Sequence, residues 1–187
     1  MKSLILASKS PRRRQLLEKC GLPFEVSPAD IDETINENGY LPDQIRMLAE
    51  RKAAAVLKDH PNEVVIGSDT IVTIDQKVLG KPKDAEDAKR MLRQLSGHTH
   101  EVITGICILS SMREYSNVSV SEVTFADLDD QEIEKYVLTG EPMDKAGAYA
   151  VQGIASRYIT RIHGDYYSIM GLPVSMVYEE LKNLNLY

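Results

Sequence analysis

One stretch near the start of the chain, residues 4–14, constrains the fold more than any other. It opens with four consecutive apolar residues at positions 4–7, a run that is typical of a short buried strand. Ser10 then suits a helix N-cap, and Pro11 suits the first helical position, where a missing backbone N–H costs nothing. Apolar residues follow at the three- and four-residue spacing of a helix. The sequence therefore predicts a strand, a tight turn and the start of a helix.

The charge of this helix start is unusual, because Arg12, Arg13 and Arg14 all fall in its first turn. A helix N-terminus already carries partial positive charge, so cations there are unfavourable. An anion between them, most simply a phosphate, would make the arrangement favourable. The alternative is a solvated basic turn, and this stretch alone leaves both interpretations open.

The overall charge limits the partners of the chain. A net charge of −6 over 187 residues argues against a broad surface for nucleic acid or for an anionic membrane. Any phosphate site must then be a local cluster of cations. The chain has no apolar run long enough to span a bilayer, and its two cysteines suggest no disulfide framework. We expect no signal peptide, because the first residues lead into only a short apolar run. We expect a cytoplasmic protein.

Residues 41–58 have a strong helical pattern with one anomaly. The apolar stripe of this predicted helix consists of Ile45, Leu48, Ala49, Ala53 and Val56. Lys52 falls on the same stripe, seven residues after Ile45. A lysine in this place either extends its side chain out to water or is held by a partner in a cleft. The pattern does not decide between the two.

A polar tetrad at residues 67–70 separates two apolar runs, 64–66 and 71–74, which we interpret as two short buried strands. Asp69 lies in this tetrad, and a carboxylate there is costly unless it is partnered or sits at a strand end. Carboxylates at strand ends are common catalytic groups in α/β folds. A turn aspartate that caps its own backbone is the alternative. We favour a catalytic Asp69.

The rest of the chain alternates helices and strands. We expect helices from 84 or 85 to Gly97, from 129 or 130 to Gly140 and from Pro173 onward, with strands at 98–109, 118–125 and 158–162, and loops at 141–153 and 164–171. Lys81 precedes a proline and is therefore held extended. The loop at 141–153 is rich in small residues and carries one cation, Lys145, and one amide, Gln152.

The candidate functional residues are mostly charged. The cations are Arg12, Arg13, Lys52, Lys81 and Lys145, and the carboxylates are Glu33, from an acidic segment that is otherwise an ordinary solvated loop, and Asp69. This is the set that a polyphosphate bound through a divalent metal would need. Hydrolysis between phosphates requires an activated water and a stabilised leaving group. We predict that Asp69 takes the proton from water.

Several segments also resemble one known family. They are Ser8-Lys9-Ser10-Pro11-Arg12-Arg13, Ala49-Glu50-Arg51-Lys52-Ala53, Gly67-Ser68-Asp69-Thr70-Ile71-Val72, Gly80-Lys81-Pro82, Leu95-Ser96-Gly97-His98, Asp144-Lys145-Ala146-Gly147-Ala148-Tyr149 and Gly171-Leu172-Pro173. Together they resemble the Maf family of nucleoside triphosphate pyrophosphatases, in the same order and nearly from end to end.

The resemblance implies a fold and an activity. The fold is an elongated mixed α/β sheet flanked by helices, with two lobes around a central cleft as in inosine triphosphatases, and it forms a single domain over residues 1–187. The activity is cleavage of a nucleoside triphosphate to the monophosphate and pyrophosphate with a divalent cation, Mg²⁺ or Mn²⁺. A cytoplasmic homodimer with no membrane or nucleic-acid polymer as partner is also expected.

The resemblance also assigns roles to residues. Asp69 would be the proton acceptor, helped by Lys52, Lys81 and Glu33. The metal would lie on Glu33 and Asp69. The phosphates would be bound by Ser8, Arg13 and Lys145. One branch of the family prefers dTTP and UTP, and its specificity positions match Arg12, Thr70 and Gln152.

The role of Gln152 makes physical sense, because an amide offers one donor and one acceptor to O4 and N3–H of uracil or thymine. Such a site rejects bases that leave buried groups unpaired. Two other functions stay open. One is a nucleotidyltransferase, whose opening strand, loop and arginine are similar but whose loop is usually richer in glycine. The other is a non-enzymatic nucleotide-binding regulator of cell division, because the family is also named for inhibition of septum formation.

Overall fold

The computed structural model describes residues 3–36 and 38–186, and the chain divides into two compact units. The first unit contains the residues up to Asp69, Thr104–Ser119 and the residues from Gly171 onward. The second unit contains Thr70–Ile103 and Val120–Met170. Helices and strands alternate in both units, which confirms the predicted mixed α/β fold.

The described strands form one seven-stranded sheet in the order β2-β1-β3-β5-β6-β7, with β4 paired to β3. The first unit holds β1 (Leu4–Leu6), α1 (Pro11–Glu18), β2 (Phe24–Val26), α2 (Leu41–Leu57) and α6 (Val174–Asn183). The second holds β4 (Lys77–Leu79), α3 (Ala85–Leu95), α4 (Asp130–Leu138), β7 (Ile159–His163), α5 (Tyr166–Met170) and the 3₁₀ turns Glu141–Asp144, Ala146–Ala148 and Ile154–Tyr158. Three long strands contribute residues to both units, namely β3 (Val64–Ile74), β5 (Thr99–Leu109) and β6 (Glu114–Phe125).

The start of the first unit has the predicted strand, turn and helix. β1 pairs in parallel with β2 and with β3, and its three residues are buried. Ser10 is the N-cap of α1, and its hydroxyl oxygen accepts a hydrogen bond from the N–H of Arg13 at 3.4 Å. Pro11 occupies the first helical position. The local sequence signals are sufficient here, since no distant contact is needed to explain the geometry.

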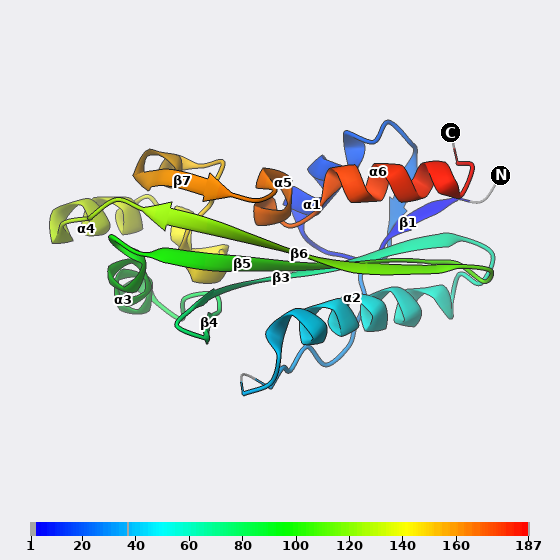
Figure 1. Cartoon of the computed structure of the whole chain (residues 1–187), viewed down its shortest axis with the longest axis horizontal. Coiled ribbons are helices and arrows are strands. Elements are labelled where there is room, and N and C mark those ends of the chain that lie inside the picture. The colour runs from blue at the N-terminus through cyan, green and yellow to red at the C-terminus, as the bar shows by residue number, and fades with distance from the viewer. Residues whose placement is uncertain (1–2, 37, 187) are drawn as a thin grey trace. The chain divides into compact units, whose positions relative to one another are not determined.

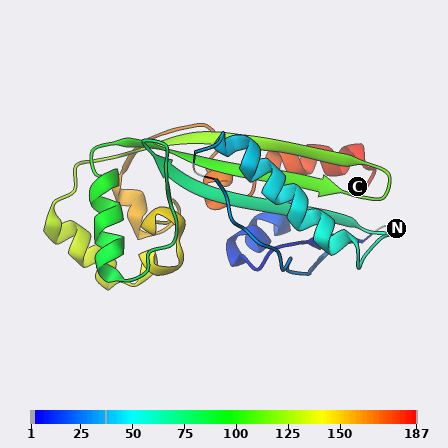
Figure 2. The same ribbon diagram turned by 90° about the horizontal axis from the view of Figure 1, so that it is seen from below.

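Helix α2 covers one face of the strands in the first unit, and α1 and α6 cover the opposite face (Figure 1, Figure 2). Two glycines set the distance between α2 and the sheet. A Cβ at Gly67 of β3 would lie 2.2 Å from the carbonyl oxygen of Ala49, and one at Gly105 of β5 would lie 2.3 Å from that of Ile45. The helix therefore packs directly on the strand backbones, and no larger residue fits at either glycine.

The interpretation of residues 64–74 as two strands separated by a polar tetrad is wrong. β3 is one continuous strand of 11 residues, and Asp69 lies in its middle rather than at a strand end. The tetrad needs no turn, because α2 covers Gly67 and backbone carbonyls accept the buried hydroxyl of Ser68. The turn comes later, at Asp75 and Gln76, whose positive φ angles of 50° and 62° suit a tight hairpin into β4.

Two other predictions, for residues 164–171 and for the strand at 118–125, differ from the structure. The loop expected at 164–171 contains the short helix α5, which begins where the Asp165 carboxylate accepts hydrogen bonds from the N–H groups of Tyr167 and Ser168. β6 starts at Glu114, four residues before the predicted strand at 118–125, because its polar first residues still pair beyond the apolar alternation.

The core of the second unit contains a buried aromatic group formed by His100, Phe125 and Tyr149. Their rings pack edge to face, with centroids 4.9 to 5.4 Å apart. The ring nitrogen Nε2 of His100 is 2.7 Å from the hydroxyl oxygen of Tyr149. His100 is 2% exposed, and this burial lowers its pKa from 6.5 to about 4.

The buried His100 predicts a specific acid sensitivity. The imidazole stays neutral in the folded chain and protonates readily once unfolded, so folding stability is full above pH 6.5 and falls as the pH drops toward 4. The shift from 6.5 to about 4 corresponds to a loss of about 3 kcal/mol of unfolding free energy. Urea unfolding of the wild type and of His100→Gln at pH 7.5 and pH 4 measures it.

In this comparison the glutamine variant should lose about 3 kcal/mol less than the wild type over the same pH interval. His163→Gln is the matched control, because the side chain of His163 is 76% exposed. An equal pH dependence in wild type and His100→Gln would contradict the prediction.

Candidate active site

The central feature of the first unit is a buried lysine held by two carboxylates. The ammonium of Lys52, on α2, donates to Asp69 Oδ1 at 2.7 Å and lies 2.8 Å from Glu33 Oε1. The side chain of Lys52 is 7% exposed and that of Asp69 is 16% exposed, whereas that of Glu33 is 57% exposed. Of the two interpretations of Lys52, the structure supports a lysine held by partners rather than one that extends into water.

Arg13 approaches Asp69 from α1. Its Nη2 lies 3.9 Å from Asp69 Oδ1, its Nε donates to the carbonyl oxygen of Gly171 at 2.9 Å, and its Nη1 donates to Ser8 Oγ at 3.3 Å. The side chain of Arg13 is 12% exposed. Desolvation lowers the pKa of Arg13, and the nearby charge of Asp69 opposes this effect. Arg13 is a cation all the same, because arginine side chains stay charged in proteins.

Electrostatically, the cluster of Arg13, Lys52, Asp69 and Glu33 is balanced, with two positive and two negative side chains. The arginines in the first turn of α1 called for a nearby anion. For Arg13, that anion is the carboxylate of Asp69. A bound polyphosphate would add several negative charges. The cluster would then need additional cations, from other side chains or from a metal.

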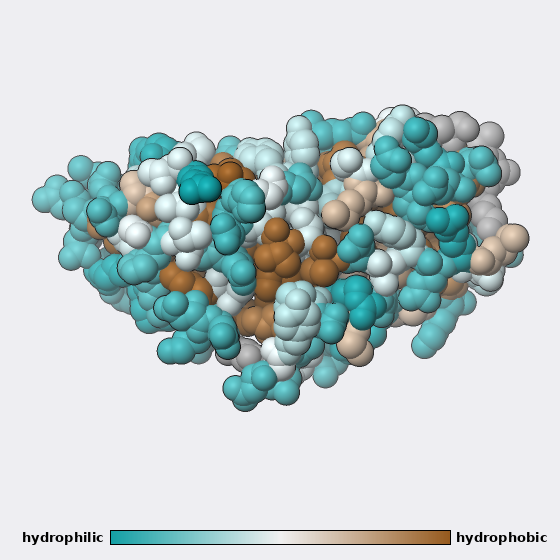
Figure 3. Space-filling view, in the orientation of Figure 1, coloured by the Kyte–Doolittle hydropathy of each residue, from teal (hydrophilic) through white to brown (hydrophobic). Residues whose placement is uncertain are grey.

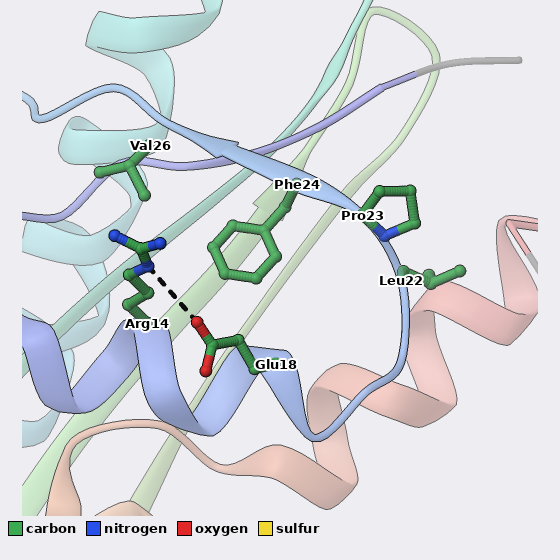
Figure 4. A pocket seen from close by; sticks show the side chains of 6 residues that line it. All are labelled: Arg14, Glu18, Leu22, Pro23, Phe24 and Val26. Atoms are coloured by element: carbon green, nitrogen blue, oxygen red, sulfur yellow. Dashed lines mark ion pairs between the residues drawn. The ribbon is translucent and has the colours of Figure 1, made fainter.

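The third arginine of α1 lies outside this cluster. Arg14 pairs with Glu18 at 3.4 Å, and both side chains are more than half exposed. They line an open hollow of about 440 Å³ between α1 and β2, together with apolar side chains that include Phe24 and Val26 (Figure 4). Arg14 is thus an ordinary solvated member of an i,i+4 ion pair.

Four of the predicted site residues belong to the second unit: Thr70, Lys81, Lys145 and Gln152. The backbone segments that carry Lys81 and Lys145 lie side by side, because the N–H of Gly147 donates to the carbonyl of Gly80 at 3.1 Å. Lys145 contacts the carboxylate of Asp144 and the carbonyl oxygen of Glu141. Lys81 and Gln152 are exposed.

Sequence reasoning missed Glu141, which holds the segment that follows Gln152. Its carboxylate accepts hydrogen bonds from the Tyr136 hydroxyl at 2.8 Å and from the N–H of Ile154 at 2.9 Å. A Cβ at Gly153 would lie 2.4 Å from this carboxylate, so a larger residue there would displace the Glu141 side chain. That glycine, next to Gln152 in a stretch of small residues, was the available signal of a close approach.

Two carboxylates of the described residues lie close together in the cluster around Lys52. No group of three or more histidine, cysteine, aspartate or glutamate residues in 3–36 and 38–186 is arranged to hold a metal ion. The carboxylates of Glu33 and Asp69 both contact the ammonium of Lys52, so they form a close pair. Mg²⁺ is commonly bound by one or two carboxylates with substrate phosphates completing its shell, so this pair fits such a metal.

The cluster sets a carboxylate between a buried lysine and an arginine, which are kinds of group that phosphoryl-transfer sites use. The chain belongs to the Maf family, since the family model described as Maf-like protein matches residues 3–184. The resemblance found in the sequence is thereby confirmed.

Curated relatives cover almost the whole chain. A protein of Bacillus cytotoxicus named dTTP/UTP pyrophosphatase is 47% identical over 185 residues, which are 99% of this chain and 97% of that protein. Proteins of the same name from a Geobacillus species and from Bacillus cereus are 49% and 45% identical over 98% and 100% of this chain, and 99% and 92% of their own lengths. Among solved structures, protein VC0702 from Vibrio cholerae matches 91% of this chain and 88% of its own at 12% identity and a TM-score of 0.43, too distant to indicate function.

Proposed function

We propose that this protein is a nucleoside triphosphate pyrophosphatase that hydrolyses dTTP and UTP to the monophosphate and pyrophosphate. The observation that carries the proposal is the position of Asp69, which is held mid-strand between Lys52 and Arg13. The names of relatives at 45–49% identity support the substrate class. Hydrolysis of a phosphoanhydride needs both halves of this arrangement, a base for water and cations for the developing charge.

In the proposed reaction, the carboxylate of Asp69 accepts a proton from the attacking water. The water oxygen bonds to the α-phosphorus, and the bond from that phosphorus to the oxygen bridging to the β-phosphate breaks. Pyrophosphate leaves with the negative charge, which Arg13 and Lys52 stabilise. The hydroxyl of Ser8, in the turn before α1, also binds the phosphates in this proposal. Lys81 and Lys145 bind the phosphates from the second unit, and their place beside the triphosphate is part of this proposal.

The proposal includes a divalent metal, Mg²⁺ or Mn²⁺, bound by Glu33 and Asp69 together with the phosphates. Charge balance supports it, because the two cations of the cluster are already matched by these two carboxylates. When bound, such a metal neutralises the polyphosphate and makes its phosphorus easier to attack. Lys52 holds both carboxylates at one point, which keeps them converged on that position.

A panel of triphosphates tests the function. With Mg²⁺ or Mn²⁺, purified protein should release pyrophosphate and monophosphate from dTTP and UTP, and chelation with EDTA should stop the release. Release without any sugar-phosphate acceptor excludes a nucleotidyltransferase. Absence of turnover with every triphosphate would overturn the proposal in favour of a non-enzymatic nucleotide-binding regulator.

Base selectivity should depend on Gln152, with Arg12 and Thr70 as the other proposed specificity positions. Gln152→Ala removes a donor and an acceptor that together match one edge of uracil or thymine, so the preference for dTTP over GTP should fall about 10-fold or more. The ratio of kcat/KM values for dTTP and GTP measures it. Gln131→Ala, a change at an exposed amide on α4, is the control. An unchanged ratio in Gln152→Ala would refute the assignment.

The remaining expectations concern assembly and location. Among the residues described, no helix combines the length and apolar character that a bilayer crossing requires. Hydrophilic residues cover most of the surface seen in Figure 3, and charged residues make up 27% of the chain. The homodimer and the cytoplasmic location stay predictions, which light scattering and cell fractionation can test.

A further inference from the structure

The residue next to Asp69 has a fully buried hydroxyl that the proposed chemistry does not use. Ser68 is 0% exposed, and its Oγ lies 2.9 Å from the carbonyl oxygen of Gly105 and 3.0 Å from that of Gly171. Both partners are pure acceptors and the hydroxyl carries a single hydrogen, so Ser68 shares that hydrogen between the two backbone carbonyls. Successive side chains of a strand point to opposite faces, so the side chains of Ser68 and Asp69 lie on opposite faces of the sheet.

The Gly171 carbonyl connects this hydroxyl to the arginine of the site. The same oxygen accepts the Nε–H of Arg13 at 2.9 Å, and a carbonyl oxygen has two lone pairs for two donors. One donor is Ser68 and the other is Arg13. Ser68 therefore fixes the acceptor that sets the direction of the guanidinium.

The direction of the Arg13 guanidinium matters for ligand binding. With Nε on Gly171 and Nη1 on Ser8, the planar fork is held at two points and Nη2 is directed toward Asp69. An arginine fixed in this way loses little freedom when an anion binds, because its rotamers are already restricted. An arginine whose acceptor can shift would lose this advantage.

We propose that Ser68 is a positioning residue that, through the Gly171 carbonyl, holds Arg13 in the orientation in which it binds the pyrophosphate portion of the substrate. The proposal rests on the proposed function, because it takes a triphosphate as the ligand. Ser68 itself does not touch the substrate, since its hydroxyl is buried among backbone carbonyls.

A double-mutant cycle tests this role. Ser68→Ala should weaken competitive inhibition by inorganic pyrophosphate and raise KM for dTTP, each about 10-fold, since it frees the acceptor of a charged donor. In an Arg13→Ala background the same change should alter inhibition less than about 2-fold, because both substitutions remove one interaction. Loss of folding stability alone would not produce this non-additivity.

The matched control is Ser121→Ala. Ser121 is also 0% exposed and hydrogen bonds to the backbone at Asp165, in the second unit. It should leave pyrophosphate inhibition unchanged. If Ser68→Ala does not fold, Ser68→Cys gives the same measurement with a side chain of similar volume and a weaker donor.

Two results would overturn the inference: pyrophosphate inhibition in the Ser68 variant equal to the wild type, or a weakening that persists in full without Arg13. Both are read in an enzyme whose wild type hydrolyses dTTP. A wild type without turnover is a different result, because it contradicts the proposed function itself.

Discussion

Replacing Asp69 by asparagine should lower kcat for dTTP by about two to four powers of ten, the usual contribution of a general base. The amide has nearly the same shape, and its oxygen can still accept the hydrogen bond that Lys52 now donates at 2.7 Å. What it cannot do is take a proton from water. Steady-state rates of pyrophosphate release at saturating dTTP measure the effect.

The control for this prediction removes a carboxylate just beyond the end of the same strand. Asp75→Asn changes an exposed residue in the turn after β3, at a positive φ angle that asparagine tolerates. It should retain wild-type kcat. If Asp69→Asn keeps more than about a tenth of the wild-type rate, another group accepts the proton and the assigned role of Asp69 is wrong.

The second large effect is expected from Lys52→Met, which keeps the length and apolar stem of the side chain but removes the charge. Asp69 and Glu33 would then face each other without their shared partner, and the leaving pyrophosphate would lose one cation. We expect kcat to fall about 100-fold, as for loss of one preorganised group that stabilises transition-state charge. The same rate assay measures it.

Lys58→Met is its control, because Lys58 is an exposed lysine at the end of the same helix. It should leave kcat within about 2-fold of the wild type, as expected for a surface change away from the site. A Lys52→Met enzyme that loses thermal stability but keeps its kcat would mean that Lys52 only neutralises a buried carboxylate.

Local signals of the sequence were enough for the first helix and for the position of Lys52. Ser10 and Pro11 start α1 through contacts within its first turn. The apolar period of α2 placed Lys52 on the buried stripe, although it did not show whether a partner holds the lysine. These features depend on neighbours within one or two helical turns. Such neighbours can be seen in a sequence without knowledge of the fold.

The error at β3 has a different origin. A polar tetrad between two apolar runs resembles a turn, and only tertiary contacts reveal that it continues the strand. Gly67 is needed for the approach of α2, and Ser68 is satisfied by carbonyls from Gly105 and Gly171, which are 37 and 103 residues away. Backbone acceptors leave no trace in a sequence, since every residue has one.

The candidate site was predicted unevenly for the same reason. Asp69 and Lys52 were chosen from their conflict with apolar surroundings, whereas Glu33 was chosen from an acidic loop segment as a possible supplier of carboxylates for a metal. Ser68 and Glu141 were missed because both act on backbone groups.

The unbroken course of β3 has a consequence for how its length can vary. Inserting or deleting one residue just before Gly67 would exchange inside and outside, turning the acid toward the place of the hydroxyl and the serine toward Lys52. The side chains of Ser68 and Asp69 point to opposite faces of the strand, so a one-residue shift that moves one of them to the other face moves both. Changes in chain length should therefore be tolerated in the hairpin turn after Ile74, and never between Val65 and Thr70.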